Sequence, residues 1–393
     1  MTSTGNLAPD LRSDPQDGTF ALPDAHALAM RLVHRAVSDL RRGTPVLLRG
    51  PDGPLVSVAA ETVGARGLAE LAAVALAAPV LLLAPVRAAA VLQRPVPQGR
   101  GSEDGAVALR LPPALLDPAV LRSLADPVAE RLLPEQPERT LAPPLGTTAI
   151  ALAKIGRLLP ALVVAPASEP AAQRLSLLAI DAADIAAYPL SAATSLTRVA
   201  EARVPLEDAQ DSRIVAFRAA DGGIEHLAIL VGDVEALVAS GGAPLSRIHS
   251  ECFTGDLLGS LKCDCGPQLR GAIAKMNEEG AGVLLYLAQE GRGIGLVNKL
   301  RAYTLQDAGL DTLDANRAIG YGADERSFLV AATMLQELGI PRVKLLTNNP
   351  DKLAGLAACG IEVLGREVHS FAGNGVNDKY LATKQDRFGH LLG

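Results

Sequence analysis

Three of the four cysteines lie within 14 positions of one another, at Cys252, Cys263 and Cys265. Two cysteines one residue apart in extended or turn structure can present both sulfurs to one ion, and the third comes from eleven residues upstream, across a glycine-containing loop. Thiolates suit Zn²⁺, and three protein ligands leave a fourth tetrahedral position for water, as in catalytic zinc sites. Such a water attacks electron-poor carbon near neutral pH. The alternative is a closed structural site in which Cys359 or a histidine is the fourth ligand.

A glycine-rich run, Gln289–Gly295, follows a predicted strand and opens a predicted helix. Glycines at such a place let backbone N–H groups approach a phosphate, and a helix N-terminus favours negative charge. The spacing matches neither the dinucleotide-binding fingerprint nor the Walker loop, so a tight strand-to-helix turn is an equal alternative. Side chains that could add positive charge stand at the ends of predicted elements. They are Arg247, Lys299, Arg301, Arg326 and Lys352.

Two further side chains could move protons. Asp324 is the candidate general base if it is held near the metal water. It could equally be the N-cap of a helix that starts at Glu325, since aspartate is favoured there, and the two roles are compatible. Tyr303, on the helix after the glycine-rich run, offers a phenol for hydrogen bonding or proton transfer, or is a half-buried structural side chain.

The composition limits the class of protein that must position these residues. Hydrophobic residues make up 49% of the 393-residue chain and charged residues 20%, which predicts packed cores. The net charge of -6 gives no overall attraction to nucleic acid. The first residues lack a basic and an apolar region, so no secretory signal is expected. The uncharged stretch Leu71–Val86 is shorter than a span of ~20 residues and is interpreted as a buried helix followed by a buried strand. We expect a cytoplasmic protein with no nucleic-acid partner and no membrane association.

The composition changes near residue 195. The first half holds one lysine, Lys154, whereas the second holds seven lysines and all the cysteines. Residues 1–20, rich in Gly, Pro, Ser and Asp, predict a disordered tail. Helical and strand patterns alternate in both halves. The pattern predicts an α/β (α+β) fold of two domains, 21–195 and 196–393, each a mixed sheet packed with helices.

Individual elements can be placed from periodicity, caps and turn residues. In the first half we predict a helix over 25–40 and strands over 44–48, 55–59 and 161–165. In the second half we predict strands over 227–231, 282–287 and 343–346, and helices over 268–279, 296–308, 325–338 and 351–358.

Six segments of the second half, taken in order and with their spacing, resemble GTP cyclohydrolase II. They are Arg247-Ile-His-Ser-Glu-Cys252-Phe-Thr-Gly-Asp256, Cys263-Asp-Cys265-Gly266, Gln289-Glu-Gly-Arg-Gly-Ile-Gly295, Asn298-Lys-Leu-Arg-Ala-Tyr303, Asp324-Glu-Arg326 and Leu346-Thr-Asn-Asn-Pro350. The resemblance runs from about Leu196 to the C-terminus. It implies hydrolysis of GTP to 2,5-diamino-6-(5-phospho-D-ribosylamino)pyrimidin-4(3H)-one, formate and pyrophosphate, the first step of riboflavin biosynthesis. It also implies one Zn²⁺ per subunit, Mg²⁺ and a homodimer.

The resemblance further implies roles for single residues. Cys252, Cys263 and Cys265 would hold zinc, Asp324 would be the proton acceptor, Arg326 the nucleophile toward the α-phosphate, and Tyr303 an aid to the imidazole-ring chemistry. The residues that would bind GTP are Arg247, Ile248, His249, Ser250, Glu251, Gln268, Glu290, Gly291, Arg292, Thr312, Thr347 and Lys352. Because arginine stays protonated in proteins, we predict that Arg326 stabilises charge on a phosphate instead. The family commonly has a basic residue before Gln289, and here it is Ala288.

The first half is similar to dihydroxybutanone phosphate synthase over residues 35–48 and 56–62. The acidic loop of that enzyme should lie between these segments, but here stands Arg49-Gly-Pro-Asp-Gly-Pro54, with one carboxylate. Without paired carboxylates there is no Mg²⁺ site of that kind, so we predict a degenerate, non-catalytic domain. The alternatives are a bifunctional enzyme that also makes dihydroxybutanone phosphate, and a non-catalytic sensor that binds zinc and GTP.

Overall fold

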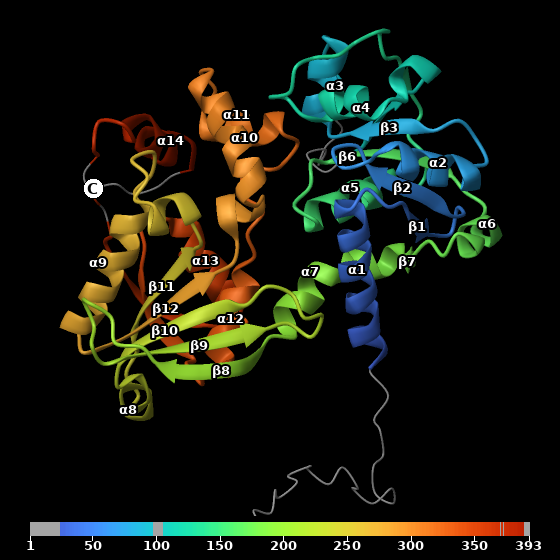
Figure 1. Ribbon diagram of the computed structural model, residues 1–393. Helices are drawn as coiled ribbons and strands as arrows, with labels where there is room; N and C mark the ends of the chain where they lie inside the picture. Colours follow the sequence, from blue (N-terminus) through green and yellow to red (C-terminus); the bar gives the residue numbers. More distant parts are fainter. Residues whose placement is uncertain (1–23, 97–104, 370, 372, 389–393) are drawn as a thin grey trace, which may run out of the picture.

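The computed structural model describes residues 24–96, 105–369, 371 and 373–388. The predicted disordered tail, residues 1–20, lies outside these ranges. Within them the chain forms two seven-stranded mixed sheets, each packed with helices, which confirms the predicted fold class. Figure 1 shows the two sheets side by side, with the first half in blue to green and the second in yellow to red.

The first sheet has the strand order β5-β4-β3-β6-β2-β1-β7, and its neighbours are antiparallel except for the pair β1–β7. Its strands are β1 (Val46–Arg49), β2 (Leu55–Ala59), β3 (Val80–Leu83), β4 (Val107–Arg110), β5 (Arg139–Thr140), β6 (Ala161–Pro166) and β7 (Ala179–Asp181). The helices of this half are α1 (Ala25–Arg41), α2 (Ala65–Val74), α3 (Pro85–Leu92), η2 (Pro113–Leu115), α4 (Pro118–Ala125), α5 (Gly146–Ile155), α6 (Glu169–Arg174) and α7 (Ala182–Thr194).

The helix predicted over 25–40 is α1, and its apolar spacing explains where it packs. Val33, Val37 and Leu40 recur every three or four residues and are buried against one face of the first sheet. The uncharged stretch Leu71–Val86 contains the end of α2 and the strand β3, which is buried as expected. The helical part is buried on one face only, at Leu71 and Val74, so the prediction of a buried helix is wrong for its other face. Within the described residues, no helix is both long and apolar enough to cross a membrane.

The second sheet has the strand order β14-β13-β11-β12-β10-β9-β8. Its strands are β8 (Thr197–Arg203), β9 (Ser212–Arg218), β10 (His226–Gly232), β11 (Leu245–Ser250), β12 (Ala281–Leu287), β13 (Arg342–Leu346) and β14 (Glu362–Glu367). Its helices are α8 (Val234–Ala239), η3 (Phe253–Leu257), α9 (Cys265–Glu278), η4 (Glu290–Gly293), α10 (Leu296–Asp307), α11 (Thr312–Ala318), α12 (Phe328–Glu337), α13 (Pro350–Ala358) and α14 (Asp378–Phe388).

The direction of the strands determines where a site can form. β14, β13, β11 and β12 run parallel, and β10, β9 and β8 continue the sheet as antiparallel strands. The carboxyl ends of β11, β12 and β13 therefore meet at one edge of the sheet. Ligands of open α/β sheets bind in the crevice beyond the carboxyl ends of the strands.

Two helices of the second half start elsewhere than predicted. α9 begins at Cys265, three residues before the predicted start, so this cysteine sits in the first turn of a helix. α12 begins at Phe328 and not at Glu325, and its N-cap is Ser327. The prediction of a helix start at Glu325 is wrong because the preceding residues form a loop in which Asp324 bonds to Arg326.

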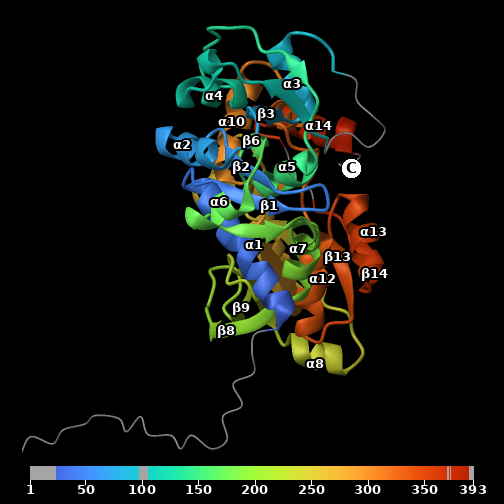
Figure 2. The ribbon, with the colours of Figure 1, turned by 90° about the vertical axis from the view of Figure 1, so that its right-hand side faces the viewer.

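The two halves are in contact over α10, α11 and α12. α12 packs on α7, and α11 packs on α3. Figure 1 shows α10 and α11 between the two halves, and in the side view of Figure 2 α10 lies behind the first sheet. Ile294, Ile319 and Tyr321 of the second half belong to the same buried apolar cluster as the first sheet. Part of the second half is therefore built onto the core of the first.

Candidate metal and anion site

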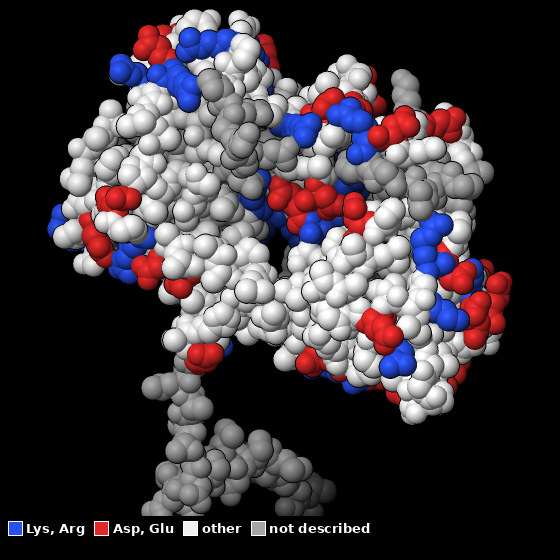
Figure 3. Space-filling view, turned by 180° about the vertical axis from the view of Figure 1, so that it is seen from behind, with Lys and Arg blue, Asp and Glu red and all other residues white. Residues whose placement is uncertain are grey.

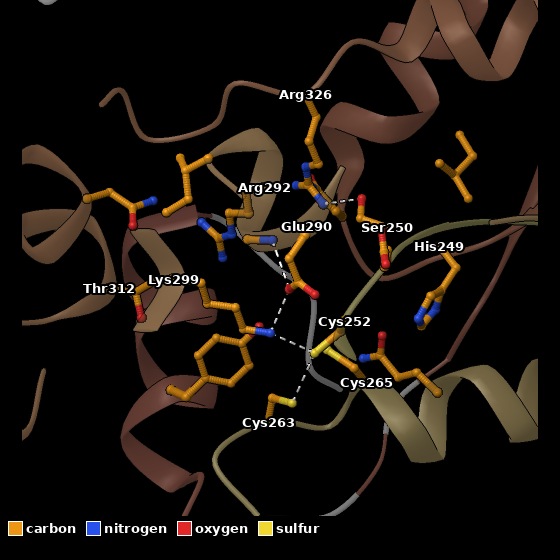
Figure 4. A pocket seen from close by; sticks show the side chains of 18 of the residues that line it. His249, Ser250, Cys252, Cys263, Cys265, Glu290, Arg292, Lys299, Thr312 and Arg326 are labelled. Carbon is orange, nitrogen blue, oxygen red and sulfur yellow. Dashed lines mark hydrogen bonds and ion pairs between the residues drawn. The ribbon is translucent and has the colours of Figure 1, made fainter. Parts of the chain in front are cut away.

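A pocket of about 1130 Å³ opens at the edge where the three parallel strands end. Its walls come from β11 and the segments that follow β11, β12 and β13, and from α9, α10 and α11. All the residues to which the sequence assigned a metal-binding, GTP-binding or catalytic role line this pocket except Asp324. Arg301, also named as a candidate positive charge, does not line it and instead binds Asp126 of the first half at 2.8 Å. Figure 4 shows Glu290, Lys299 and the three cysteines converging inside the pocket, with Arg326 close to Ser250.

The three cysteines meet at the floor of the pocket. Their sulfurs lie within 4.8 Å of one another, and Cys252 Sγ is 3.7 Å from Cys263 Sγ. Two thiolates bound tetrahedrally at ~2.3 Å from zinc would be about 3.8 Å apart, so the observed spacing fits the ion. The absence of a side chain at Gly255 provides the space in which the sulfurs meet, because a Cβ there would stand 2.7 Å from Cys263 Sγ. Among the described residues the cluster has these three members, and Cys359 lies elsewhere, at the end of α13.

The pKa values of the clustered cysteines are shifted in opposite directions. Hydrogen bonds with the other two thiols, joined by one from Lys299, hold the pKa of Cys252 far below its usual range. The hydrogen bond with Cys252 is the main cause that raises the pKa of Cys263 to about 11, and burial and the charge of Cys252 add to it. The Lys299 ammonium lies 2.9 Å from Cys252 Sγ (Figure 4). Thiolates are the form that binds zinc, and metal binding deprotonates the remaining thiols.

Asp256 holds the metal loop, the segment from Cys252 to Cys263, against β11 and β12. Its carboxylate accepts hydrogen bonds from Cys252 N at 3.0 Å and from the Tyr286 hydroxyl at 3.0 Å. His249 Nε2 lies 3.1 Å from the same carboxylate, and its ring stacks on Tyr286. Burial lowers the pKa of His249, so the imidazole is neutral at pH 7. Such partners fix the orientation of ligand loops.

The glycine-rich run forms a tight turn between β12 and α10. Gly291, Gly293 and Gly295 have φ values of 63°, 95° and 85°, which a side chain would strain. Arg292 shares this left-handed conformation at φ 63°, an outlier for a non-glycine residue that is typical of functional sites. The Glu290 carboxylate accepts hydrogen bonds from Phe253 N at 2.7 Å and Lys299 Nζ at 2.8 Å. Glu290 therefore ties the glycine-rich turn to the metal loop.

Buried, positively charged side chains line the pocket at Arg247 and Lys352. Arg247 donates to Leu346 O and to Gln268, but its buried Nε has no hydrogen-bond partner. Burial lowers the pKa of Arg247 to about 10, which leaves it charged at pH 7. Lys352 Nζ donates to Ile248 O at 2.8 Å. An unpaired buried guanidinium N–H is costly, and an anion in the pocket can satisfy it.

Asp324 and Arg326 form a bidentate ion pair at the rim. Arg326 Nε donates to Asp324 Oδ1 at 2.8 Å, and Nη2 bonds to the other oxygen. Burial alone would raise the pKa of Asp324, but the hydrogen bonds and charge of Arg326 outweigh burial and lower it. Arg326 Nη1 also reaches Ser250 Oγ at 3.4 Å (Figure 4). The alternative role of Asp324 as a helix N-cap is wrong, since α12 starts at Phe328 and its N-cap position is Ser327.

The sequence profile of the GTP cyclohydrolase II family matches residues 197–368. A relative from Azospirillum brasilense described as GTP cyclohydrolase-2 is 48% identical over 395 residues, which cover 98% of this chain and 99% of the relative. The chain belongs to the GTP cyclohydrolase II family. A shorter GTP cyclohydrolase-2 from Actinobacillus succinogenes is 49% identical over 197 residues, which cover 50% of this chain and 88% of the relative.

Membership confirms the activity predicted from the sequence. The chain is an enzyme with GTP cyclohydrolase II function in riboflavin biosynthesis, and its three clustered cysteines are consistent with the zinc site. GTP is the substrate that the family implies.

Solved structures give a weaker likeness. The chain is similar to a two-domain 3,4-dihydroxy-2-butanone 4-phosphate synthase from A. baumannii at 19% identity and a TM-score of 0.32, covering 86% of this chain and 99% of that one. The synthase of Candida albicans matches at 16% identity and a TM-score of 0.30, covering 40% of this chain and 96% of that one. At such TM-scores no conclusion about the first half follows.

Three other residues predicted from the resemblance to GTP cyclohydrolase II lie on different elements around the pocket. Tyr303 is on α10, and its hydroxyl lies 3.4 Å from Thr254 Oγ1. Burial is the main cause that raises the pKa of Tyr303, so the phenol keeps its proton at neutral pH. Thr312 is the first residue of α11, and Thr347 follows β13. All three side chains line the pocket.

Sequence reasoning did not single out several residues that support the GTP cyclohydrolase II pocket. Asp256 ends a segment that carried the family resemblance, and its carboxylate was a possible signal. Lys299 was noted only as a cation, although its spacing of four residues from Tyr303 places both on one helix face. Tyr380 of α14 is partly buried and lines the pocket from outside the matched family segment. No signal in the sequence indicated Tyr380.

Proposed function

We propose that this pocket is where GTP is bound and converted to the pyrimidine product, formate and pyrophosphate. The observation that carries the proposal is the combination, in one pocket, of three sulfurs at zinc-binding spacing and a buried guanidinium with an unsatisfied N–H. The first feature suits hydrolysis at a carbon atom. The second suits a phosphate.

Cys252, Cys263 and Cys265 would hold the zinc ion at the floor of the pocket. When bound, Zn²⁺ supplies Lewis acidity that makes water nucleophilic near neutral pH. Asp256 fixes the loop that carries Cys252 through a hydrogen bond from its backbone N–H. Tyr303 lies beside this loop and can donate a hydrogen bond to the nitrogen atoms of the opening imidazole ring.

The phosphate chain would lie at the cationic side of the pocket. Guanidinium groups of Arg247, Arg292 and Arg326 line it, together with the Lys352 ammonium. The residues proposed to contact GTP are Arg247, Ile248, His249, Ser250, Glu251, Gln268, Glu290, Gly291, Arg292, Thr312, Thr347 and Lys352. Mg²⁺ would arrive with the triphosphate, because this ion keeps several waters and binds substrate phosphates with one or two carboxylates.

The ion pair at the rim suggests how Asp324 becomes a base. A carboxylate whose pKa is lowered by an arginine is a weak proton acceptor. A phosphate offers Arg326 a second bidentate partner, and when Arg326 turns to it, Asp324 loses the charge that lowers its pKa. Arg326 then stabilises negative charge on the phosphate and is not a nucleophile. A covalent guanylyl adduct trapped on Arg326 would contradict this role.

A homodimer is part of the proposal, with the metal loop at its interface. The exposed apolar side chains of this region are Phe253, Leu257, Leu258 and Leu261 of the loop and Val297 and Leu300 of α10. Lys262 binds Asp307 at 2.6 Å and so brings the loop and α10 together. An apolar patch of this kind marks a protein interface. Leu257→Asp should shift the mass measured by light scattering from dimer to monomer.

The division of labour between the halves is also proposed. Residues 21–195 would form a degenerate, non-catalytic domain and residues 196–393 the GTP cyclohydrolase II domain. The turn between β1 and β2 carries one carboxylate, Asp52, which is exposed, so it offers little acid–base capacity. Reduced thiols in the metal cluster fit a cytoplasmic location.

The decisive experiment incubates the zinc-loaded full chain with GTP and Mg²⁺ and measures formate, pyrophosphate and the pyrimidine product together. Equal amounts of all three are expected. Pyrophosphate without formate would mean that the phosphate site works but the zinc chemistry does not. No product from folded, zinc-loaded protein would indicate a sensor and would overturn the proposal. Dihydroxybutanone phosphate formed from ribulose 5-phosphate would show that the first half is catalytic.

A further inference from the structure

The first half contacts the segments of the second half that carry the proposed chemistry. Lys154 Nζ binds Glu325 at 3.0 Å, between Asp324 and Arg326 in the sequence. On α10, Arg301 Nε binds Asp126 at 2.8 Å. The Tyr321 hydroxyl donates to Leu158 O at 2.5 Å. Seen from behind, acidic and basic side chains crowd the junction between the two halves, while most of the surrounding surface is uncharged (Figure 3).

Arg157 makes the most direct of these contacts. Its Nη2 donates a hydrogen bond of 2.5 Å to Ala288 O, across 131 positions of sequence. Its own carbonyl accepts a hydrogen bond of 2.9 Å from Asn298 Nδ2 on α10. The side chain lies against Gly295, where a Cβ would stand 3.0 Å from Arg157 Cδ. Arg157 therefore touches the glycine-rich turn at both of its ends.

The end of α5 sets the direction in which Arg157 leaves the first half. The φ of Arg157 is 54°, a left-handed conformation that costs a non-glycine residue about 1 kcal/mol or more. The conformation follows α5 and Gly156 and directs the chain toward the second half. Two hydrogen bonds at the end of α5 hold this conformation, from Leu158 N to Ala153 O at 3.0 Å and from Arg157 N to Lys154 O at 2.9 Å, as in a common helix C-cap.

Ala288 is held from two sides. Its N–H donates to His226 Nδ1 on β10 at 3.0 Å, while its C=O accepts from Arg157. Burial, helped by the Arg157 charge, lowers the pKa of His226 to about 4, so the imidazole is neutral and can accept. Both backbone polar groups of Ala288, the residue before the turn, are thus fixed. Glu290, which ties the turn to the metal loop, follows two residues later.

We propose that Arg157 is a positioning residue for the GTP site, contributed by the otherwise non-catalytic first half. It fixes the backbone of Ala288 and the turn that follows. The Lys154–Glu325 pair does the same for the segment of Asp324 and Arg326. This inference rests on the proposed function of the pocket. The first half is then an integral part of the active site.

The test compares Arg157→Ala with wild type in the full chain, using formate release from GTP. We expect kcat/KM to fall at least tenfold and KM for GTP to rise. The zinc content should stay unchanged at one ion per chain. Arg157→Lys keeps a charge and a donor and should lose less than threefold. The control is Arg49→Ala, since Arg49 pairs with Glu169 on the surface of the first half and should leave both constants unchanged.

The outcomes separate this inference from the proposed function. Both kinetic constants of Arg157→Ala within twofold of wild type would overturn it, as would a loss in Arg157→Lys equal to that in Arg157→Ala. Should Arg157→Ala not fold, Arg157→Gln keeps most of the volume and one donor without the charge, and the same criteria apply. Absence of formate from the wild-type chain would instead refute the proposed function of the pocket.

Discussion

Gly255 offers a sharp test of the metal site. Its φ lies outside the left-handed region, so alanine is acceptable to the backbone, and only the space around it opposes a side chain. A Cβ would stand 2.7 Å from Cys263 Sγ and 2.9 Å from Cys252 Sγ. Ordinary contact begins at 3.4 Å, so one sulfur must move by about 0.7 Å. Zinc sites tolerate deviations of about 0.2 Å in ligand distance.

We therefore expect Gly255→Ala to weaken zinc binding by at least tenfold, the range seen when residues next to metal ligands are changed. Zinc affinity is measured by competition with a chromogenic chelator, and formate release is measured at saturating zinc and at limiting zinc. The control is Gly365→Ala on β14, where an added Cβ meets nothing within 4 Å. A zinc dissociation constant for Gly255→Ala within twofold of wild type would refute the reasoning.

Three other substitutions test separate parts of the site. Cys263→Ser should abolish formate release and lower zinc content while GTP still binds by calorimetry, and loss of both activities together would contradict separate zinc and phosphate sites. Asp324→Asn should lower kcat by ~10²-fold or more with KM little changed, since general bases contribute about that much, and a kcat near wild type would exclude Asp324 as the base. Burial lowers the pKa of His226 to about 4 from an ordinary 6.5, so the folded state binds fewer protons between these values, and stability should fall by up to about 3 kcal/mol as the pH drops from 6.5 to 4. His226→Asn, which keeps an acceptor for Ala288 N, should flatten that dependence in urea unfolding at pH 7 and pH 5, and an unchanged slope would contradict the assignment.

The parts of the fold that could be predicted are those where one periodic pattern dominates. The apolar runs of β10, β12 and β13 and the stripe of α1 are repeated locally, and burial follows directly. β11 was not predicted, because Ser246, Arg247 and His249 interrupt its apolar residues although all three are buried. Arg247 and His249 line the pocket, so the residues that the site requires obscured the apolar pattern of the strand.

The residues of the candidate site could be predicted from the sequence, but the contacts between them could not. Short motifs identify the cysteines and the glycine-rich turn, since each chemistry needs particular residue types close together. The Asp324–Arg326 pair and the contact of Arg157 with Ala288 depend on side-chain geometry and on distant packing. No local pattern specifies either of them.

Glu290 has a thermodynamic consequence for the enzyme. One carboxylate accepts hydrogen bonds from the metal loop, the glycine-rich turn and Lys299, so metal and nucleotide act on a shared element. If zinc orders this element, the ion should increase the affinity for GTP. Linkage then requires that GTP increase the affinity for zinc by the same factor. At limiting zinc, substrate would thus recruit the ion, and apoprotein would be rescued by the nucleotide on which it acts.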